Sequence, residues 1–87
     1  MELIGELLRK SRISKKLDLR KVSSTLNISK NILEDIENNH FPDYIDKVFL
    51  IGHIRTYARY LNLDDDKIAA TFKIQISYNR DTSIKEV

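Results

Sequence analysis

Side chains that could act as acids, bases, nucleophiles or metal ligands are few in this sequence and are poorly spaced for such chemistry. The two histidines, His40 and His53, lie thirteen positions apart, without the cysteine or carboxylate spacing that is typical of a metal site. Cysteine is absent, and the two glycines cannot form a phosphate-binding loop. We therefore expect no catalytic residue, no metal, no cofactor and no small-molecule substrate, and we predict that the chain is not an enzyme.

The distribution of charge points instead to a macromolecular partner. The 87 residues carry 15 Lys and Arg against 13 Asp and Glu, so the net charge is only +2. From Arg9 to Lys30, however, eight basic residues accompany the single acid Asp18, whereas residues 31–46 hold five acidic residues and no Lys or Arg. The basic segment could attract a polyanion or anionic lipid headgroups, and the acidic segment would repel them.

Helical spacing of apolar residues organises the chain. Two glycines and one proline leave little material for hairpins, and no useful segment alternates apolar with polar residues. The pattern predicts an all-α domain of five helices. The first two cover residues 1–13 and 19–26, and the third begins at residue 30, after a Ser29 cap. The fourth begins at residue 43 or 46 and ends at 61, and the fifth begins between residues 64 and 66 and ends at 73. Asn27 and Asn62 are expected to take left-handed turn conformations. Residues 1–73 would form the domain, and residues 74–87 a polar tail or the start of a linker.

The second and third predicted helices, joined by a tight turn, form a helix-turn-helix. Three residues at the start of the third helix could contact base edges in the DNA major groove: Ser29, Lys30 and Asn31. Four basic residues could hold the phosphates beside them: Lys15, Lys16, Arg20 and Lys21. Carboxylates that phosphates would repel follow on the same helix, at Glu34, Asp35 and Glu37. The alternative interpretation is a Ser29 that only caps the helix and basic residues that form a solvated surface.

The fourth predicted helix carries two stripes of apolar and aromatic residues. The first stripe suits burial in the domain and contains Leu50, Ile54, Tyr57, Ala58 and Leu61. The second is centred about 110° around the helix from the first and contains Phe49, His53, Thr56 and Tyr60. Either the fifth helix covers this second stripe or a partner does. Gly52 costs the helix roughly 1 kcal/mol relative to alanine, so we expect a neighbouring backbone, internal or from a partner, to approach it closely.

Three segments together resemble the cytoplasmic domain of the RodZ family: Ile4 to Arg12, the helix-turn-helix from Leu19 to Glu37, and above all Gly52 to Leu61, Gly-His-Ile-Arg-Thr-Tyr-Ala-Arg-Tyr-Leu. The resemblance covers residues 2–73. It implies a five-helix bundle with a fold similar to that of the lambda repressor. It also implies that this bundle acts as an adaptor, which binds the actin-like protein MreB in bacterial cell-shape maintenance. RodZ proteins span the membrane once, so the resemblance also implies a place on the cytoplasmic side of the inner membrane and a tether outside this chain.

The resemblance singles out the second stripe of the fourth helix. RodZ-like domains contact MreB through aromatic residues at the positions of Phe49 and His53. The predicted partner-binding residues are therefore Phe49, His53, Thr56, Tyr60 and Lys47. The sequence departs from the family pattern at Ile51, where a basic residue is usual, at His53 itself, and at Asn62, where glycine is common. A sequence-specific DNA-binding regulator that uses the third helix is the alternative function.

Overall fold

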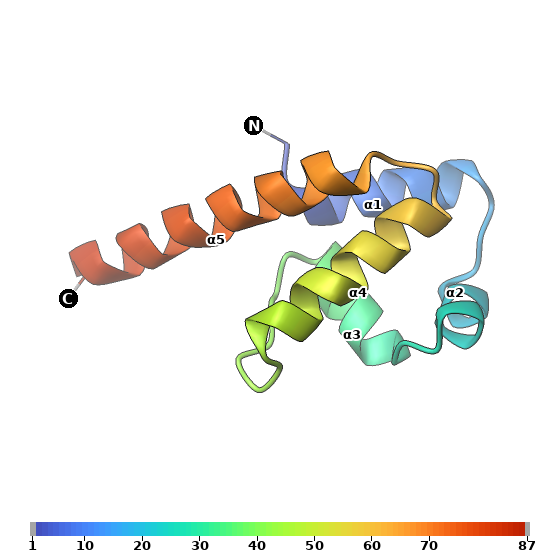
Figure 1. Ribbon diagram of the computed structural model, residues 1–87, viewed down its shortest axis with the longest axis horizontal. Helices are drawn as coiled ribbons and strands as arrows, with labels where there is room; N and C mark the ends of the chain where they lie inside the picture. Colours follow the sequence, from blue (N-terminus) through green and yellow to red (C-terminus); the bar gives the residue numbers. More distant parts are fainter. Residues whose placement is uncertain (1, 87) are drawn as a thin grey trace.

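Five helices and no strand make up the part of the chain that the computed structural model describes, which is the backbone of residues 2–86 with the side chains of residues 2–77 (Figure 1). The helices are α1 (Ile4–Ser14), α2 (Leu19–Leu26), α3 (Lys30–Glu37), α4 (Lys47–Tyr60) and α5 (Asp65–Glu86). The predicted all-α class and the helix-turn-helix of α2 and α3 are therefore confirmed. α1 begins three residues later than the sequence pattern indicated.

Short-range capping interactions fix most helix ends where the sequence placed them. The carboxylate of Asp18 accepts a hydrogen bond from the backbone N–H of Arg20, and that of Asp46 accepts one from Val48, so each satisfies a free N–H of a first helical turn. Asn27 and Asn62 have φ values of 56° and 62°, the predicted left-handed turns. Ser29 occupies the N-cap position of α3, but its side chain makes no capping hydrogen bond.

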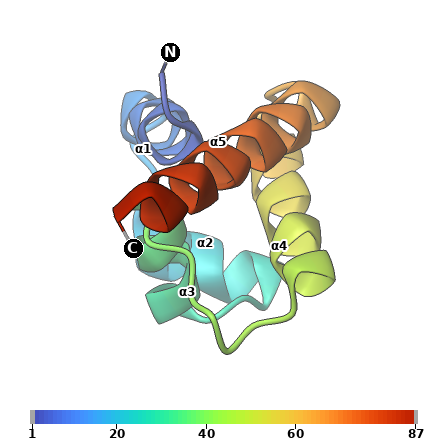
Figure 2. The same ribbon diagram turned by 90° about the vertical axis from the view of Figure 1, so that its left-hand side faces the viewer.

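The helices enclose one hydrophobic core. α5 crosses α1 and α4, while α2 and α3 lie on the other side of the molecule (Figures 1 and 2). The largest fully buried side chains come from all five helices and are Ile4, Leu8, Val22, Leu33, Ile36, Ile54, Tyr57, Leu61 and Phe72. The ring of Phe41, from the α3–α4 loop, meets that of Phe72 edge-on at a centroid distance of 4.8 Å. This contact attaches the loop to α5 and so helps to position the start of α4.

The two glycines have opposite surroundings. A Cβ on Gly5 would lie 2.5 Å from the carbonyl oxygens of both Ile36 and Glu37, so α1 can cross the end of α3 only without a side chain at this position. At Gly52, a Cβ would meet no atom within 4 Å. The close internal neighbour considered for Gly52 is therefore absent, and the glycine that packing requires is Gly5.

A buried carboxylate joins three helices. Glu37, at the end of α3, is only 3% exposed, and its oxygens accept hydrogen bonds from Arg12 Nε at 2.7 Å and Arg12 Nη2 at 3.0 Å. The hydroxyl of Tyr57, from α4, donates a further hydrogen bond to it, and Arg9 Nε lies 3.6 Å away. Glu37 is one of the three acidic residues that the sequence suggested could repel a duplex, but this network places it inside. The carboxylate is buried because Arg12 and Tyr57 replace the water that it loses.

A second polar contact joins α5 to α1 beyond Lys73, the predicted end of the domain. Gln75 is 2% exposed; its carbonyl oxygen accepts from the backbone N–H of Ile4 at 3.1 Å, and its amide nitrogen donates to Asn39 at 3.0 Å. The same oxygen of Asn39 accepts from the N–H of Gly5 at 2.9 Å. α5 runs through Glu86, beyond the predicted end of the fifth helix at residue 73. Its Gln75 caps α1, whose own N-cap residue makes no side-chain hydrogen bond.

Replacement of Gln75 by alanine should lower the free energy of unfolding by about 1–3 kcal/mol, because the buried N–H of Ile4 loses its acceptor. Urea denaturation of the variant beside wild type measures the loss. Ser77→Ala, an exposed change two residues further along α5, is the matched control and should stay within about 0.5 kcal/mol. Equal stability of Gln75→Ala and Ser77→Ala would contradict the capping of α1 by α5.

Tyr57 should make stability depend on pH in alkaline solution. Burial raises the pKa of the Tyr57 hydroxyl above its ordinary value, and the hydrogen bond to Glu37 raises this pKa further. Above about pH 10, Tyr57 ionises in the unfolded chain but not in the folded chain. The contribution of Tyr57 to the free energy of unfolding is therefore fully present below about pH 10 and falls above it, by up to about 1.4 kcal/mol per pH unit. Thermal melts between pH 7 and 11 should show this alkaline loss of stability in wild type and in Tyr44→Phe, a control at an exposed tyrosine. The loss should be absent from Tyr57→Phe. The same alkaline slope in all three proteins would refute it.

Candidate docking face on α4

The inner side of α4 is built as predicted. All five residues of the first stripe are buried, namely Leu50, Ile54, Tyr57, Ala58 and Leu61. They pack into the core against α5 and the rest of the domain. Because α4 repeats every 3.6 residues, burial of this stripe turns the opposite side of the helix outward.

The second stripe, which we call the α4 face and define as Phe49, His53, Thr56 and Tyr60, is graded from exposed to half-buried. Phe49 is 67% exposed, whereas His53 and Thr56 are half-buried. Tyr60 is also half-buried, and it packs against the core. α5 therefore leaves the Phe49 end of the face uncovered. Lys47, the remaining predicted residue, is exposed at the first position of α4.

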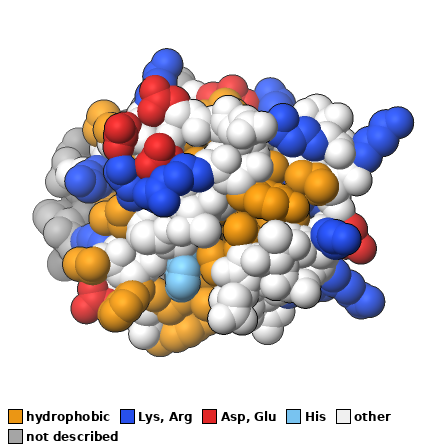
Figure 3. All heavy atoms as spheres, turned by 45° about the vertical axis from the view of Figure 1, so that its right-hand side comes forward, with side chains coloured by type: hydrophobic (Ala, Val, Ile, Leu, Met, Phe, Trp, Pro, Cys, Tyr) orange, Lys and Arg blue, Asp and Glu red, His pale blue; other side chains and the backbone are white. Residues whose placement is uncertain are grey.

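Two further large apolar side chains, in the loop before α4 and in its first turn, are exposed. Val48 is 75% exposed, and Tyr44, in the loop before α4, is 77% exposed. Gly52, one turn after Val48, is exposed as well. Figure 3 shows one side of the molecule, on which hydrophobic side chains gather next to a histidine. Helical spacing in the sequence places Val48 opposite the buried Tyr57, but Val48 belongs to neither of the two predicted stripes.

The charges near the α4 face are basic on the helix and acidic beyond its end. α4 contains Lys47, Arg55 and Arg59 and no carboxylate. Arg55 and Arg59, predicted to face water, lie 3.0 and 3.2 Å from the carboxylate of Asp65. Arg55 also pairs with Asp66, and this hydrogen bond is the main cause of its raised pKa. Among the described residues Lys47 has no such partner, so it is the α4 cation best placed to meet an acidic partner surface.

The run of acids at the start of α5 is accounted for by local contacts. Asp64 accepts a hydrogen bond from the backbone N–H of Lys67, as a residue that begins a helix does. Asp65 and Asp66 hold the two arginines of α4. Carboxylate oxygens of the three residues lie within 4.8 Å of one another, and these contacts account for their clustering at the turn between α4 and α5.

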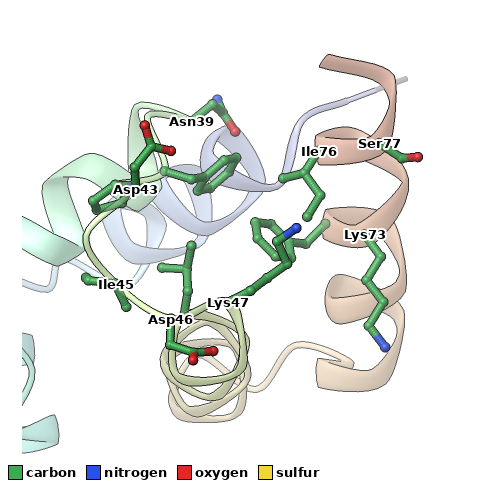
Figure 4. Close-up of a pocket in the computed structure, with 12 residues that line it drawn as sticks. Asn39, Asp43, Ile45, Asp46, Lys47, Lys73, Ile76 and Ser77 are labelled. Carbon is green, nitrogen blue, oxygen red and sulfur yellow. The ribbon is translucent and has the colours of Figure 1, made fainter. Parts of the chain in front are cut away.

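A groove of about 730 Å³ lies between the α3–α4 loop, the start of α4 and the middle of α5. Its apolar lining is formed by Phe41, Ile45, Leu50, Phe72 and Ile76. Lys47 and Lys73 stand at its polar rim, and Figure 4 shows Lys47 extending toward Ile76 of α5 while Asp46 turns its carboxylate away. The exposed end of α4 is therefore next to a hollow and not to a flat surface.

The candidate DNA-contacting residues are all on the surface. Exposed positions are occupied by Ser29, Lys30, Asn31, Lys15, Lys16, Arg20 and Lys21. Lys30 is not free of acidic neighbours, because its ammonium lies 3.3 Å from the carboxylate of Glu34. Glu37 is buried, so only Glu34 and Asp35, both half-buried, remain of the three acids expected to repel a duplex. The geometry thus leaves a small polar surface at the start of α3.

Comparison with known proteins places the chain among helix-turn-helix domains. Residues 7–68 match a family described as helix-turn-helix domain. An uncharacterised protein of Haemophilus influenzae is 36% identical over 62 residues, which are 70% of this chain and 20% of that protein. The chain therefore spans about one fifth of the length of that relative. Among the described residues, no helix is both long and apolar enough to cross a lipid bilayer.

Two solved structures have a similar fold. A chain in the structure entitled "Bacterial actin MreB assembles in complex with cell shape protein RodZ" aligns with 97% of this chain and over 92% of its own length, with a TM-score of 0.80 and 24% identity. YmfM of Staphylococcus aureus, proposed to be a DNA-binding membrane protein, aligns with 83% of this chain and 88% of its own length, with a TM-score of 0.75 and 26% identity. The RodZ-like five-helix fold expected from the sequence is therefore confirmed.

The graded burial of α4 predicts that its two sides differ in their contribution to stability. Phe49→Ala should change the free energy of unfolding by less than about 1 kcal/mol, because the ring is mostly in water already. The adjacent change Leu50→Ala should cost about 2–5 kcal/mol, because it leaves a cavity in the core. Chemical denaturation of both variants tests the assignment, and a Phe49→Ala loss as large as that of Leu50→Ala would show that Phe49 is a core residue.

Proposed function

The chain belongs to the helix-turn-helix domain family, and from this premise we propose that it is a non-catalytic adaptor that binds the actin-like protein MreB in the maintenance of bacterial cell shape. The observation that carries the proposal is the exposed aromatic end of α4 on a fold shared with RodZ. A domain of this size gains nothing for its own stability by leaving these side chains in water. Their exposure is the expected property of a binding surface.

The contact would be centred on Phe49. Aromatic side chains that are exposed in the free protein and buried in the complex often provide much of the energy of an interface. His53, Thr56 and Tyr60 would surround this anchor, and their half-buried positions limit the rotamer freedom lost on binding. Lys47 would add attraction to an acidic surface at the edge of the contact.

The adaptor would act on the cytoplasmic side of the inner membrane, as part of a longer protein with a membrane-spanning segment. Two comparisons support this part of the proposal. YmfM, with a similar fold, is described as a membrane protein, and the Haemophilus influenzae relative is about five times as long as the part that matches. Membrane attachment would place the actin-like filament next to the envelope.

DNA binding through α3 is the second candidate function. It is favoured by the exposure of Ser29, Lys30 and Asn31 and by the similarity to YmfM. It is the weaker candidate because Lys30 already faces Glu34, and because reading a duplex with α3 would not explain the exposed apolar residues of α4.

Sedimentation with polymerised MreB from the same organism tests the leading proposal. Wild-type chain should enter the pellet with the filaments, and Phe49→Ala should weaken binding by about 30-fold, as loss of a 2 kcal/mol anchor would. His53→Ala should weaken binding by a smaller factor. Lys30→Ala and Ile13→Ala, the latter removing an exposed apolar side chain from α1, should bind as wild type does.

A wild-type chain that stays in the supernatant would contradict MreB binding. If the same protein then binds duplex DNA with an affinity that falls as salt rises and falls again in Lys30→Ala, the second candidate function is the correct one.

A further inference from the structure

Gly52 has no structural reason within the domain to be glycine. It lies in the interior of α4, with ordinary negative φ, so its backbone conformation does not demand it. No atom lies within 4 Å of the position where a Cβ would stand, so packing does not demand it either. Gly5, whose missing side chain lets α1 touch α3, shows what a packing requirement looks like in this fold.

A glycine at such a position lowers helix stability, because it frees the unfolded backbone and exposes helical peptide groups to water. Alanine would fit here without any adjustment of a neighbour. The domain thus carries a residue that is unfavourable for its own folding and that nothing inside it uses. We attribute the glycine at position 52 to a contact that the domain makes with a partner.

The surroundings of Gly52 indicate what kind of contact this is. Helical spacing places Val48 and Phe49 one turn before it and Thr56 one turn after it, all on the outward side of α4. Val48 and Phe49 are 75% and 67% exposed, so they form two apolar walls beside bare helix backbone. On this side of α4, main chain without a side chain at Gly52 therefore lies between exposed apolar side chains.

We propose that Gly52 is itself a contact site, at which an apolar segment of the actin-like subunit packs directly on the backbone of α4 between Val48, Phe49 and Thr56. This inference rests on the proposed function and names a part of the same interface. The apolar walls and the absence of any carboxylate on α4 favour an apolar segment as the occupant. The missing Cβ lets the two backbones approach more closely than the usual separation of packed helices, about 8–10 Å between axes.

The proposal predicts opposite effects of one methyl group on folding and on binding. Gly52→Ala should raise the melting temperature of the free chain by about 2–8 °C. In sedimentation with MreB filaments, the same variant should bind at least about tenfold more weakly than wild type, and the bulkier Gly52→Leu should bind more weakly still. Thr71→Ala, which also introduces a better helix former but lies on α5, is the matched control and should keep wild-type binding.

The outcomes separate this inference from the proposed function. If wild type binds filaments, Phe49→Ala does not, and both Gly52 variants bind as wild type does, Gly52 is not a contact and the adaptor function stands. A lower melting temperature for Gly52→Ala would overturn the premise that the domain itself does not need glycine. If wild type fails to bind filaments at all, the proposed function and the Gly52 contact are both wrong.

Discussion

The carboxylate of Glu37 is the constraint on which the arrangement of the helices depends. A carboxylate removed from water costs several kcal/mol unless its partners are complete, and its partners here are Arg12 of α1 and Tyr57 of α4. They can meet only when α1, α3 and α4 are correctly placed together. The same contact fixes the rotation of α4: with Tyr57 turned inward, Val48, nine residues earlier, must lie on the outer side. A polar contact in the core therefore determines which apolar side chains remain outside.

Local chemistry in the sequence was enough to predict the type and approximate position of all five helices. The capping residues Asp18 and Asp46 and the left-handed Asn27 and Asn62 act within a few residues, so the sequence displays them directly. The burial of polar side chains could not be predicted, because it depends on partners far away in the sequence. Arg12 and Glu37 are 25 residues apart, and a charged or amide side chain appears suited to the surface until its buried partner is known. For the same reason the sequence alone did not indicate that Gln75 is buried.

The candidate site was only partly visible in the sequence. Two stripes on α4 follow from periodicity, and the first proved to be core, but periodicity could not decide whether α5 covers the second. In the structure Tyr60 packs against the core, and Phe49 is left in water. Tyr44 has no periodicity to reveal it, because it lies in a loop. Gly52 was recognised as costly from its residue type alone, but only the empty space around it shows that the cause lies outside the domain.

The hydrogen bond between Ile4 and Gln75 spans 71 positions, almost the whole chain. As a nascent polypeptide leaves the ribosome, the first turn of α1 emerges first, yet the side chain that satisfies it is among the last of the core to appear. Closing so long a loop is entropically expensive, and it is repaid only when α5 packs on α1 and α4. α1 also packs on α3, but the N–H of Ile4 gains its buried acceptor only when α5 is in place.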